Sequence, residues 1–171
     1  MSGPEPEVRA VVEAQLGRPP RALRAVAHRC TCGLPDVIET NPVLADGSPF
    51  PTLYYLTCPR AASAVGRLES DGVMRAMNAR LAEDGELAER YAAADAAYRD
   101  RRTALGGRAD LPTAGGMPVR VKCLHALVAH ALAAGPGVNP FGDEALALVG
   151  DWGARGPCVD VDADPAAGGA A

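Results

Sequence analysis

The stretch PVRVKCLHALVAHALAA, residues 118–134, decides the fold. Apart from Arg120 and Lys122, the residues after Pro118 are Val, Cys, Leu, His and Ala on every side of a helix. Pro118 suits the first turn of a helix, and Gly135 is a residue that commonly ends one. A helix that is apolar all round is normally buried. We therefore predict a central helix over residues 118–134, with the rest of the chain packed around it.

Three short runs upstream of this helix carry the pattern of β-strands. They are rich in β-branched and aromatic residues, are separated by turn signals, and cover residues 23–29, 37–40 and 52–57. The two-residue period of a strand places Tyr54 and Leu56 on one face and Tyr55 on the other. The pattern predicts a small antiparallel sheet of about three strands.

Apolar residues at helical spacing predict further helices. One covers residues 4–16, and three follow one another between residues 60 and 105, divided near Asp71 and Asp84. A last helix is expected over residues 145–149, with Asp143 as its N-cap. The fold class is therefore α+β, with about five or six helices, one of them central and buried.

Length and composition indicate a single domain. The chain has 171 residues, of which 48% are hydrophobic and 22% are charged, a balance typical of a globular protein. We place the α+β domain over residues 1–156. Residues 157–171 are rich in Pro, Gly, Ala and Asp, and we expect a disordered tail there because such a segment buries too little apolar surface to offset its chain entropy.

Charge and hydropathy exclude two classes of partner. The formal net charge is −4, and residues 151–171 supply −3 of it, with four Asp against Arg155, so the body is nearly neutral. Its arginines are interspersed with acidic residues, which is unlike the basic stripe of a nucleic-acid binder. No apolar run is long enough to span a membrane, and no signal peptide is visible. We expect a cytoplasmic protein that binds neither nucleic acid nor membrane; its oligomeric state is left open.

Cysteine and histidine carry the most distinctive chemistry. Disulfides are rare in a reducing cytoplasm, so the five cysteines are explained by burial, metal binding or reactivity. Cys30 and Cys32 point to the same face of an extended segment and can present two sulfurs together. With Cys58 from a neighbouring strand and Cys123 from the central helix they would make a four-ligand set of the kind that zinc prefers.

Two other interpretations of these residues stay open. Buried free cysteines often behave as small inert hydrophobes. Alternatively, a thiol is reactive where cations lower its pKa, and Arg29, Arg60 and Lys122 each adjoin a cysteine in the sequence. In that case Cys58 would be the nucleophile, Arg60 would bind an anionic substrate, and the base would be one of the helical histidines, His125 or His130. Cys158 lies in the tail and is expected to take no part.

Several blocks of the sequence resemble a known family when taken together and in order. They are HRCTCGLP (28–35), DGSPFPTLYYLTCP (46–59), GGMPVRVKCLH (115–125) and GPGVNP (135–140). The chain resembles, over about residues 28–144, the actinobacterial domain of unknown function 501 family. The resemblance implies no established activity. Genes of that family often adjoin those for a septum-formation initiator and an exopolyphosphatase, which implies a loose tie to cell division or phosphate metabolism.

Two functions are compatible with these patterns. The first is a zinc-stabilised module that binds a protein partner, with a link to cell division or envelope control. The second is a small cysteine-dependent enzyme that transfers acyl or phosphoryl groups on an anionic substrate. A closed four-ligand site favours the first function, and an open pocket beside a reactive thiol favours the second.

Overall fold

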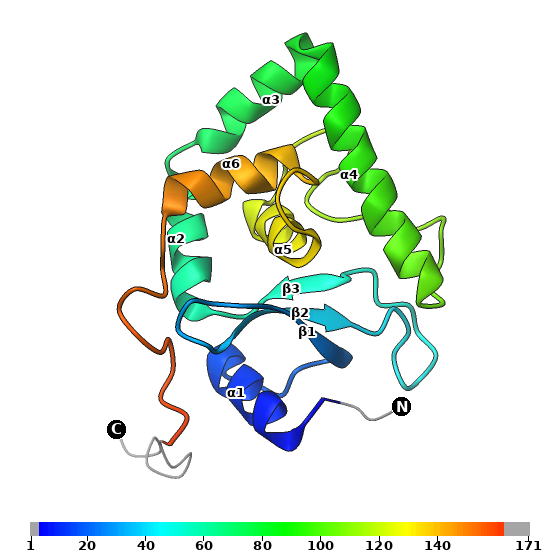
Figure 1. Ribbon diagram of the computed structural model, residues 1–171. Coiled ribbons are helices and arrows are strands. Elements are labelled where there is room, and N and C mark those ends of the chain that lie inside the picture. Colours follow the sequence, from blue (N-terminus) through cyan, green and yellow to red (C-terminus); the bar gives the residue numbers. More distant parts are fainter. Residues whose placement is uncertain (1–3, 163–171) are drawn as a thin grey trace.

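The computed structural model describes residues 4–162, which form an α+β fold (Figure 1). The described residues contain a three-stranded antiparallel sheet and six helices, as the sequence predicts. In chain order the elements are α1 (Pro6–Leu16), β1 (Leu23–Arg29), β2 (Pro35–Thr40), β3 (Tyr54–Leu56), α2 (Pro59–Ser70), α3 (Val73–Glu83), α4 (Gly85–Ala104), α5 (Leu124–Ala134) and α6 (Pro140–Val149).

The sheet separates the fold into layers. Its strands lie in the order β1-β2-β3, with Val37 of β2 opposite Leu56 of β3 and Ile38 opposite Tyr55. Helix α1 covers one face, and α5 lies on the other with α2, α4 and α6 around it (Figure 1). Tyr54 and Leu56 pack in the large helical core, whereas Tyr55 packs beside α1. This alternation confirms the predicted two faces of the third strand.

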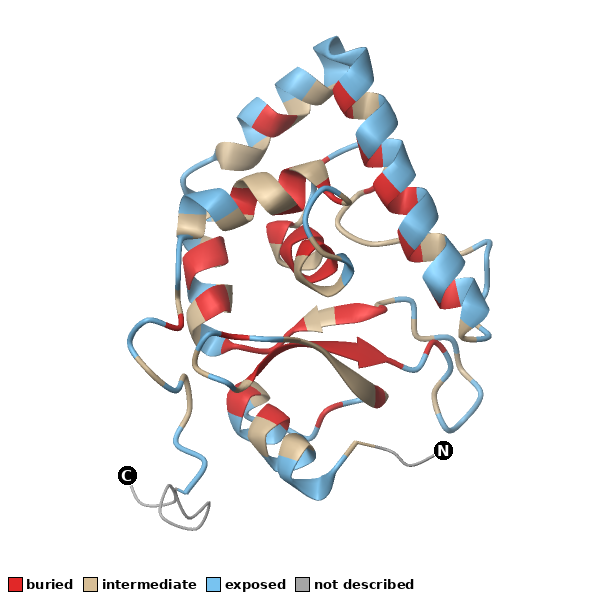
Figure 2. Ribbon diagram, in the orientation of Figure 1, coloured by how far each residue is buried: buried red, intermediate tan, exposed pale blue. Residues whose placement is uncertain are grey.

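Helix α5 is the buried centre of the larger core. Leu124, Leu127 and Val128 have no exposed surface, and His130 is 1% exposed. Figure 2 shows α5 largely in the buried colour, enclosed by helices whose outer faces are exposed. The prediction of a central buried helix is confirmed, but its start at Pro118 is wrong, because the helix begins at Leu124.

The residues before α5 form a turn and an irregular segment instead of a helix, and helix α3 offers this segment hydrogen bonds. The side-chain amide of Asn78 pairs with the backbone of Val121, accepting its N–H at 2.8 Å and donating to its carbonyl at 2.8 Å. A backbone satisfied in this way has no need of helical hydrogen bonds. Cys123 has the extended conformation of an N-cap, with φ −145° and ψ 110°, so helical geometry does not apply to it.

Helix α6 is longer than expected and has a different N-cap. It begins at Pro140, and the side chain of Asn139 accepts a hydrogen bond from the Gly142 N–H at 2.9 Å. Asp143, the predicted N-cap, lies inside the first turn and accepts the Gly137 N–H at 2.8 Å. The Asn-Pro pair, which also occurs in turns, here begins a helix because Pro suits its first position.

After α6 the chain returns along α2 toward the turn between β1 and β2 (Figure 1). The expected tail begins at residue 157, and its residues 163–171 lie outside the described part of the chain. Within the described part, Cys158 is half-buried and packs against the core. In residues 4–162 no helix combines the length and the apolar character needed to cross a membrane.

Candidate functional site

The Cys30 and Cys32 thiols lie in the tight turn that joins β1 to β2. The Cys30 carbonyl accepts the Gly33 N–H at 2.9 Å, and the Cys32 N–H donates to the Cys30 sulfur at 3.3 Å. Burial raises the pKa of the Cys30 thiol. Burial acts in the same direction on Cys32, but hydrogen bonds to its sulfur, first from the backbone of Leu34, lower its pKa overall. The two sulfurs therefore interact across a tight turn, whereas the sequence analysis placed both cysteines in an extended segment.

Two more cysteines lie beside this turn. Cys58 is the N-cap of α2 and has no exposed surface. Burial raises the pKa of its thiol to about 12, and the neighbouring Cys158 thiol acts in the same direction. The Cys158 backbone in turn lies close enough to the Cys32 sulfur to lower the pKa of that thiol. Four of the five cysteines thus come together from the first turn of the sheet, the start of α2 and the segment after α6.

The segment of residues 151–158 is held over the cysteines by polar contacts from three elements. Thr31 donates to Asp151 at 2.8 Å, Arg60 donates to the Gly156 carbonyl at 2.7 Å, and Gln15 donates to the Cys158 sulfur at 3.3 Å. Gly153 fits so closely that a Cβ there would lie 2.5 Å from the Cys30 sulfur. We call Cys30, Cys32, Cys58 and Cys158 the four-thiol cluster.

The four-thiol cluster consists of two interacting pairs. Cys30 interacts with Cys32, and Cys58 interacts with Cys158. In the described residues, no three of these sulfurs lie mutually within 4.8 Å. Neighbouring sulfurs around a tetrahedral zinc ion are roughly 3.8 Å apart, given bonds of about 2.3 Å. A metal bound by all four sulfurs would therefore have to draw the two pairs together.

Cys123 does not join this cluster, contrary to the sequence prediction. It lies beside Glu69, eleven residues along α2 from Cys58. A helix rises about 1.5 Å per residue, so the two thiols are at opposite ends of α2, roughly 16 Å apart. The reason is that the segment before α5 is bound to α3 through Asn78 and so places Cys123 beside Glu69, away from the sheet turn.

Glu69, Cys123 and His125 form a second group, in which one ligand atom from each lies within 4.8 Å of the others. The Glu69 Oε1 atom is 3.2 Å from His125 Nδ1 and accepts the Leu124 N–H at 2.7 Å. The other ring nitrogen of His125, Nε2, lies 3.0 Å from the Ala62 carbonyl. We call these three residues the Glu-Cys-His cluster.

The pKa values in the Glu-Cys-His cluster shift in opposite directions. The hydrogen bond with His125 lowers the pKa of the Cys123 thiol. The same hydrogen bond, reinforced by Glu69, raises the pKa of His125 to about 9. His125 is half-buried, with 34% of its side chain exposed, so solvent reaches this cluster. The prediction that the central helix is buried all round is therefore wrong at His125.

His130 is a core residue and is remote from both clusters. Its ring stacks on Tyr54 and meets Tyr98 edge-on, and its Nδ1 lies 3.2 Å from the side-chain amide of Asn139. Burial lowers the pKa of His130 to about 4. A neutral histidine enclosed in this way cannot reach Cys58 as a base, so its contribution is to packing.

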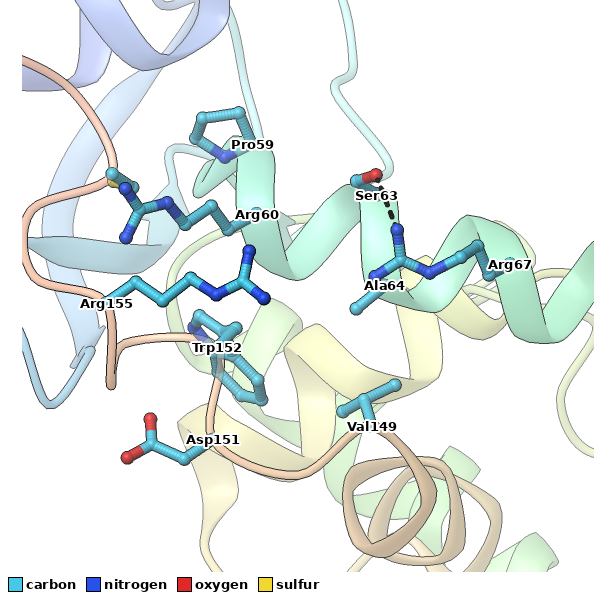
Figure 3. A pocket seen from close by; sticks show the side chains of 10 residues that line it. Pro59, Arg60, Ser63, Ala64, Arg67, Val149, Asp151, Trp152 and Arg155 are labelled. Carbon is cyan, nitrogen blue, oxygen red and sulfur yellow. Dashed lines mark hydrogen bonds between the residues drawn. The ribbon is translucent and has the colours of Figure 1, made fainter.

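Of the three candidate cations, only Arg60 lines a pocket. Arg29 is exposed and donates to the Gly33 carbonyl, and Lys122 is exposed beside the Glu-Cys-His cluster. Arg60 belongs to a pocket of about 500 Å³ between α2 and the segment after α6. Arg60 and Arg67 extend from α2 and Arg155 extends from that segment, above Trp152 (Figure 3). We call this cavity the arginine pocket.

The arginine pocket carries uncompensated positive charge. In the described chain none of its three arginines is ion-paired with a carboxylate; Arg60 donates to a backbone carbonyl and Arg67 to a serine hydroxyl. Its one acidic residue, Asp151, already accepts hydrogen bonds from Thr31 and from the Gly153 N–H. The Trp152 Nε1 atom is buried and has no hydrogen-bond partner in residues 4–162.

The functional residues missed by sequence reasoning lie far from their partners along the chain. Glu69 sits on an amphipathic helix, where a carboxylate indicates only a solvated face. Cys158 lies in the stretch whose Pro and Gly content predicts a disordered tail. Trp152 and Arg155 fall within the predicted domain, at its end, where no local pattern indicates a site.

Comparison with known proteins gives a family and no activity. Residues 26–147 match the family described as "Protein of unknown function (DUF501)". No curated protein and no solved structure matches this chain. The matched region contains Cys30, Cys32 and Cys58 as well as the Glu-Cys-His cluster, whereas Cys158 lies beyond it. Because the match covers well over half of the sequence, the chain belongs to the DUF501 family.

Proposed function

We propose that this chain is a cytoplasmic, zinc-stabilised module that binds a protein partner through the arginine pocket. The observation that carries the proposal is the meeting of four thiols from three distant parts of the sequence. In this arrangement the ion ties residues 151–158 to the sheet turn and to α2. A role in division or envelope control of an actinobacterium rests on the family resemblance alone.

The chemistry of the four-thiol cluster suits a closed structural site. Zinc is held in such sites by four tetrahedral ligands, often all cysteine. The backbone N–H of Cys32 already points at the Cys30 sulfur, and hydrogen bonds of this kind favour the thiolate form that binds metal. Cys30 and Cys58 are buried, so an ion at their sulfurs would be shielded from exchange with solvent.

The arginine pocket supplies the binding surface. Its outer wall is the segment that the ion would tie down, so metal binding and pocket shape are coupled. Three arginines without carboxylate partners favour an acidic group, and the guanidinium fork suits a carboxylate or a phosphate in a bidentate pair.

The enzyme alternative with Cys58 as nucleophile has less support. Cys58 has no exposed surface, and burial raises its pKa to about 12. A reactive cysteine needs the opposite, an accessible sulfur with a lowered pKa. His125 packs against α2 between Ala62 and Glu69, with both ring nitrogens engaged there, and His130 is enclosed, so neither ring pairs with Cys58 as a base.

Metal analysis of cysteine variants tests the proposal. Cys32→Ser and Cys158→Ser should each release the same single ion and lower the melting temperature. A loss of about 2 kcal/mol corresponds to about 4–8 °C in a domain of this size. The matched control is Cys123→Ser, which should leave that ion in place. Retention of the ion and of the melting temperature in both variants would contradict the proposal.

A second assay tests the partner surface. Arg155→Glu reverses one charge of the pocket on an exposed side chain and should leave the fold unchanged. Chemical crosslinking in the native cell should give a product with the wild-type chain and lose it with this variant, while Arg9→Glu on α1 serves as the exposed control. Equal crosslinking by the wild type and Arg155→Glu would exclude the arginine pocket as the binding surface.

A further inference from the structure

We propose that the Glu-Cys-His cluster is a second metal site, one that binds a zinc-class divalent cation through Glu69, Cys123 and His125 and leaves one coordination position open. The three side chains come from the end of α2 and from the start of α5, and solvent reaches them. The site is independent of the four-thiol cluster, which lies at the other end of α2.

The hydrogen bond of His125 to α2 leaves the ligand nitrogen free. A carbonyl oxygen only accepts, so the Ala62 carbonyl, 3.0 Å away, fixes the hydrogen on Nε2. Nδ1, which faces Glu69 at 3.2 Å, is then the nitrogen that binds an ion, and the ion takes the place of the proton that Nδ1 otherwise shares with Glu69. Metal-binding histidines almost always donate their second ring N–H to a carbonyl or carboxylate in this way, which orients the ring.

The other two ligands are oriented by backbone groups. The Glu69 carboxylate accepts the Leu124 N–H at 2.7 Å, which holds it against the start of α5. Cys123 is the residue before that helix, and its extended backbone follows the Val121 segment that Asn78 clamps. Three electron-rich atoms therefore converge on one point, and such an arrangement is stable only if a proton or a cation lies between them.

The donor atoms select the class of ion. Sulfur, nitrogen and carboxylate oxygen together suit zinc and related transition metals, whereas Mg²⁺ and Ca²⁺ prefer oxygen alone. Ligands around a zinc ion with bonds of 2.0–2.3 Å are about 3.3–3.8 Å apart, so a group already within 4.8 Å needs only a small contraction. Three protein ligands beside solvent leave the fourth position for water or for a small ligand, as in catalytic zinc sites.

Titration of the full-length, metal-free chain with Co²⁺ tests the proposal, because thiolate-bound Co²⁺ has a distinctive visible spectrum. The wild type should bind a Co²⁺ ion that Cys123→Ser does not bind. Glu69→Gln and His125→Gln should each lower the affinity for this ion by at least about 100-fold. Loss of a residue that only hydrogen-bonds a metal ligand already lowers metal affinity by about 10–100-fold. Cys158→Ser is the matched control and should retain this ion.

An added azide ion reports on the open position. Azide should change the Co²⁺ spectrum of the wild type and of Cys158→Ser, and should have no such effect on Cys123→Ser. If only the proposal for the four-thiol cluster is wrong, the wild type still binds one ion per chain at the Glu-Cys-His cluster, and Cys123→Ser does not bind it. The present proposal is overturned if Cys123→Ser, folded by circular dichroism, binds as many ions as the wild type, or if azide leaves the wild-type spectrum unchanged.

Discussion

Protonation of His130 should be a major cause of acid destabilisation. The ring is 1% exposed and its Nδ1 lies 3.2 Å from the Asn139 side chain, whose amide nitrogen can only donate. His130 is therefore neutral in the folded protein, with Nδ1 accepting that hydrogen bond. Protonation would bury a charge and set an N–H against an NH₂ group, which is why the pKa of His130 falls to about 4.

The size and the sign of the effect follow from the two pKa values. The pKa of His130 is about 6.5 in the unfolded chain and about 4 in the folded one. Between these values the unfolded chain binds more protons, so stability falls as the pH falls. The contribution is complete above about pH 6.5 and is lost by about pH 4. At about 1.4 kcal/mol per pKa unit, the loss is about 3 kcal/mol.

Urea unfolding at pH 7, 6, 5 and 4 measures this loss. His130→Phe should be less stable than the wild type at pH 7 but should lose about 3 kcal/mol less between pH 6.5 and pH 4. Tyr98→Phe is the control, since it removes the hydroxyl that accepts the Leu53 N–H and leaves the histidine in place. Parallel pH profiles for His130→Phe and the wild type would refute this explanation.

Three further substitutions test the packing and the buried hydrogen bonds of the fold. Gly153→Ala places a methyl group against the Cys30 sulfur and should cost about 1–3 kcal/mol in urea unfolding, whereas Gly85→Ala, which meets open space, should stay within about 0.5 kcal/mol of the wild type. Asn78→Ala leaves a backbone N–H and a carbonyl unpaired before α5, so we expect a loss of about 2–4 kcal/mol by the same assay and weaker Co²⁺ binding at Cys123. Arg102→Lys should lower the melting temperature and cost about 2 kcal/mol of stability, because a lysine cannot donate to the Leu111 and Pro112 carbonyls together as the buried guanidinium does. An unchanged melting temperature would contradict this.

The sequence predicts the elements of this fold well because its periodicities are local. The three β-type runs and the breaks near Asp71 and Asp84 depend on neighbouring residues, and the structure confirms them. The start of α5 could not be predicted in the same way. Residues 118–123 have a composition suited to a helix, but the amide of Asn78, more than forty residues earlier, binds the Val121 backbone, and the Gly115 carbonyl accepts the Lys122 N–H.

The candidate site was predictable in part, for the same physical reason. Cys30 and Cys32 are neighbours, so their pairing follows from local geometry. Whether Cys123 or Cys158 lies beside the other three cysteines depends on which distant segment returns to the sheet turn. Composition favours Cys123, which is wrong. Glu69 gave no signal, because a carboxylate on a helix surface has the same sequence pattern whether or not a histidine packs against it.

X-ray absorption spectroscopy of the zinc-loaded Cys123→Ser variant tests the central claim most directly, because this variant retains only the four-thiol cluster as a proposed metal site. The account predicts a single shell of four sulfur atoms at about 2.3 Å from the ion. The same spectrum after Cys158→Ser is added should show fewer sulfur neighbours or no bound ion. A shell made of nitrogen or oxygen atoms at about 2.0–2.1 Å, or an ion whose sulfur count does not change when Cys158 is replaced, would contradict the account.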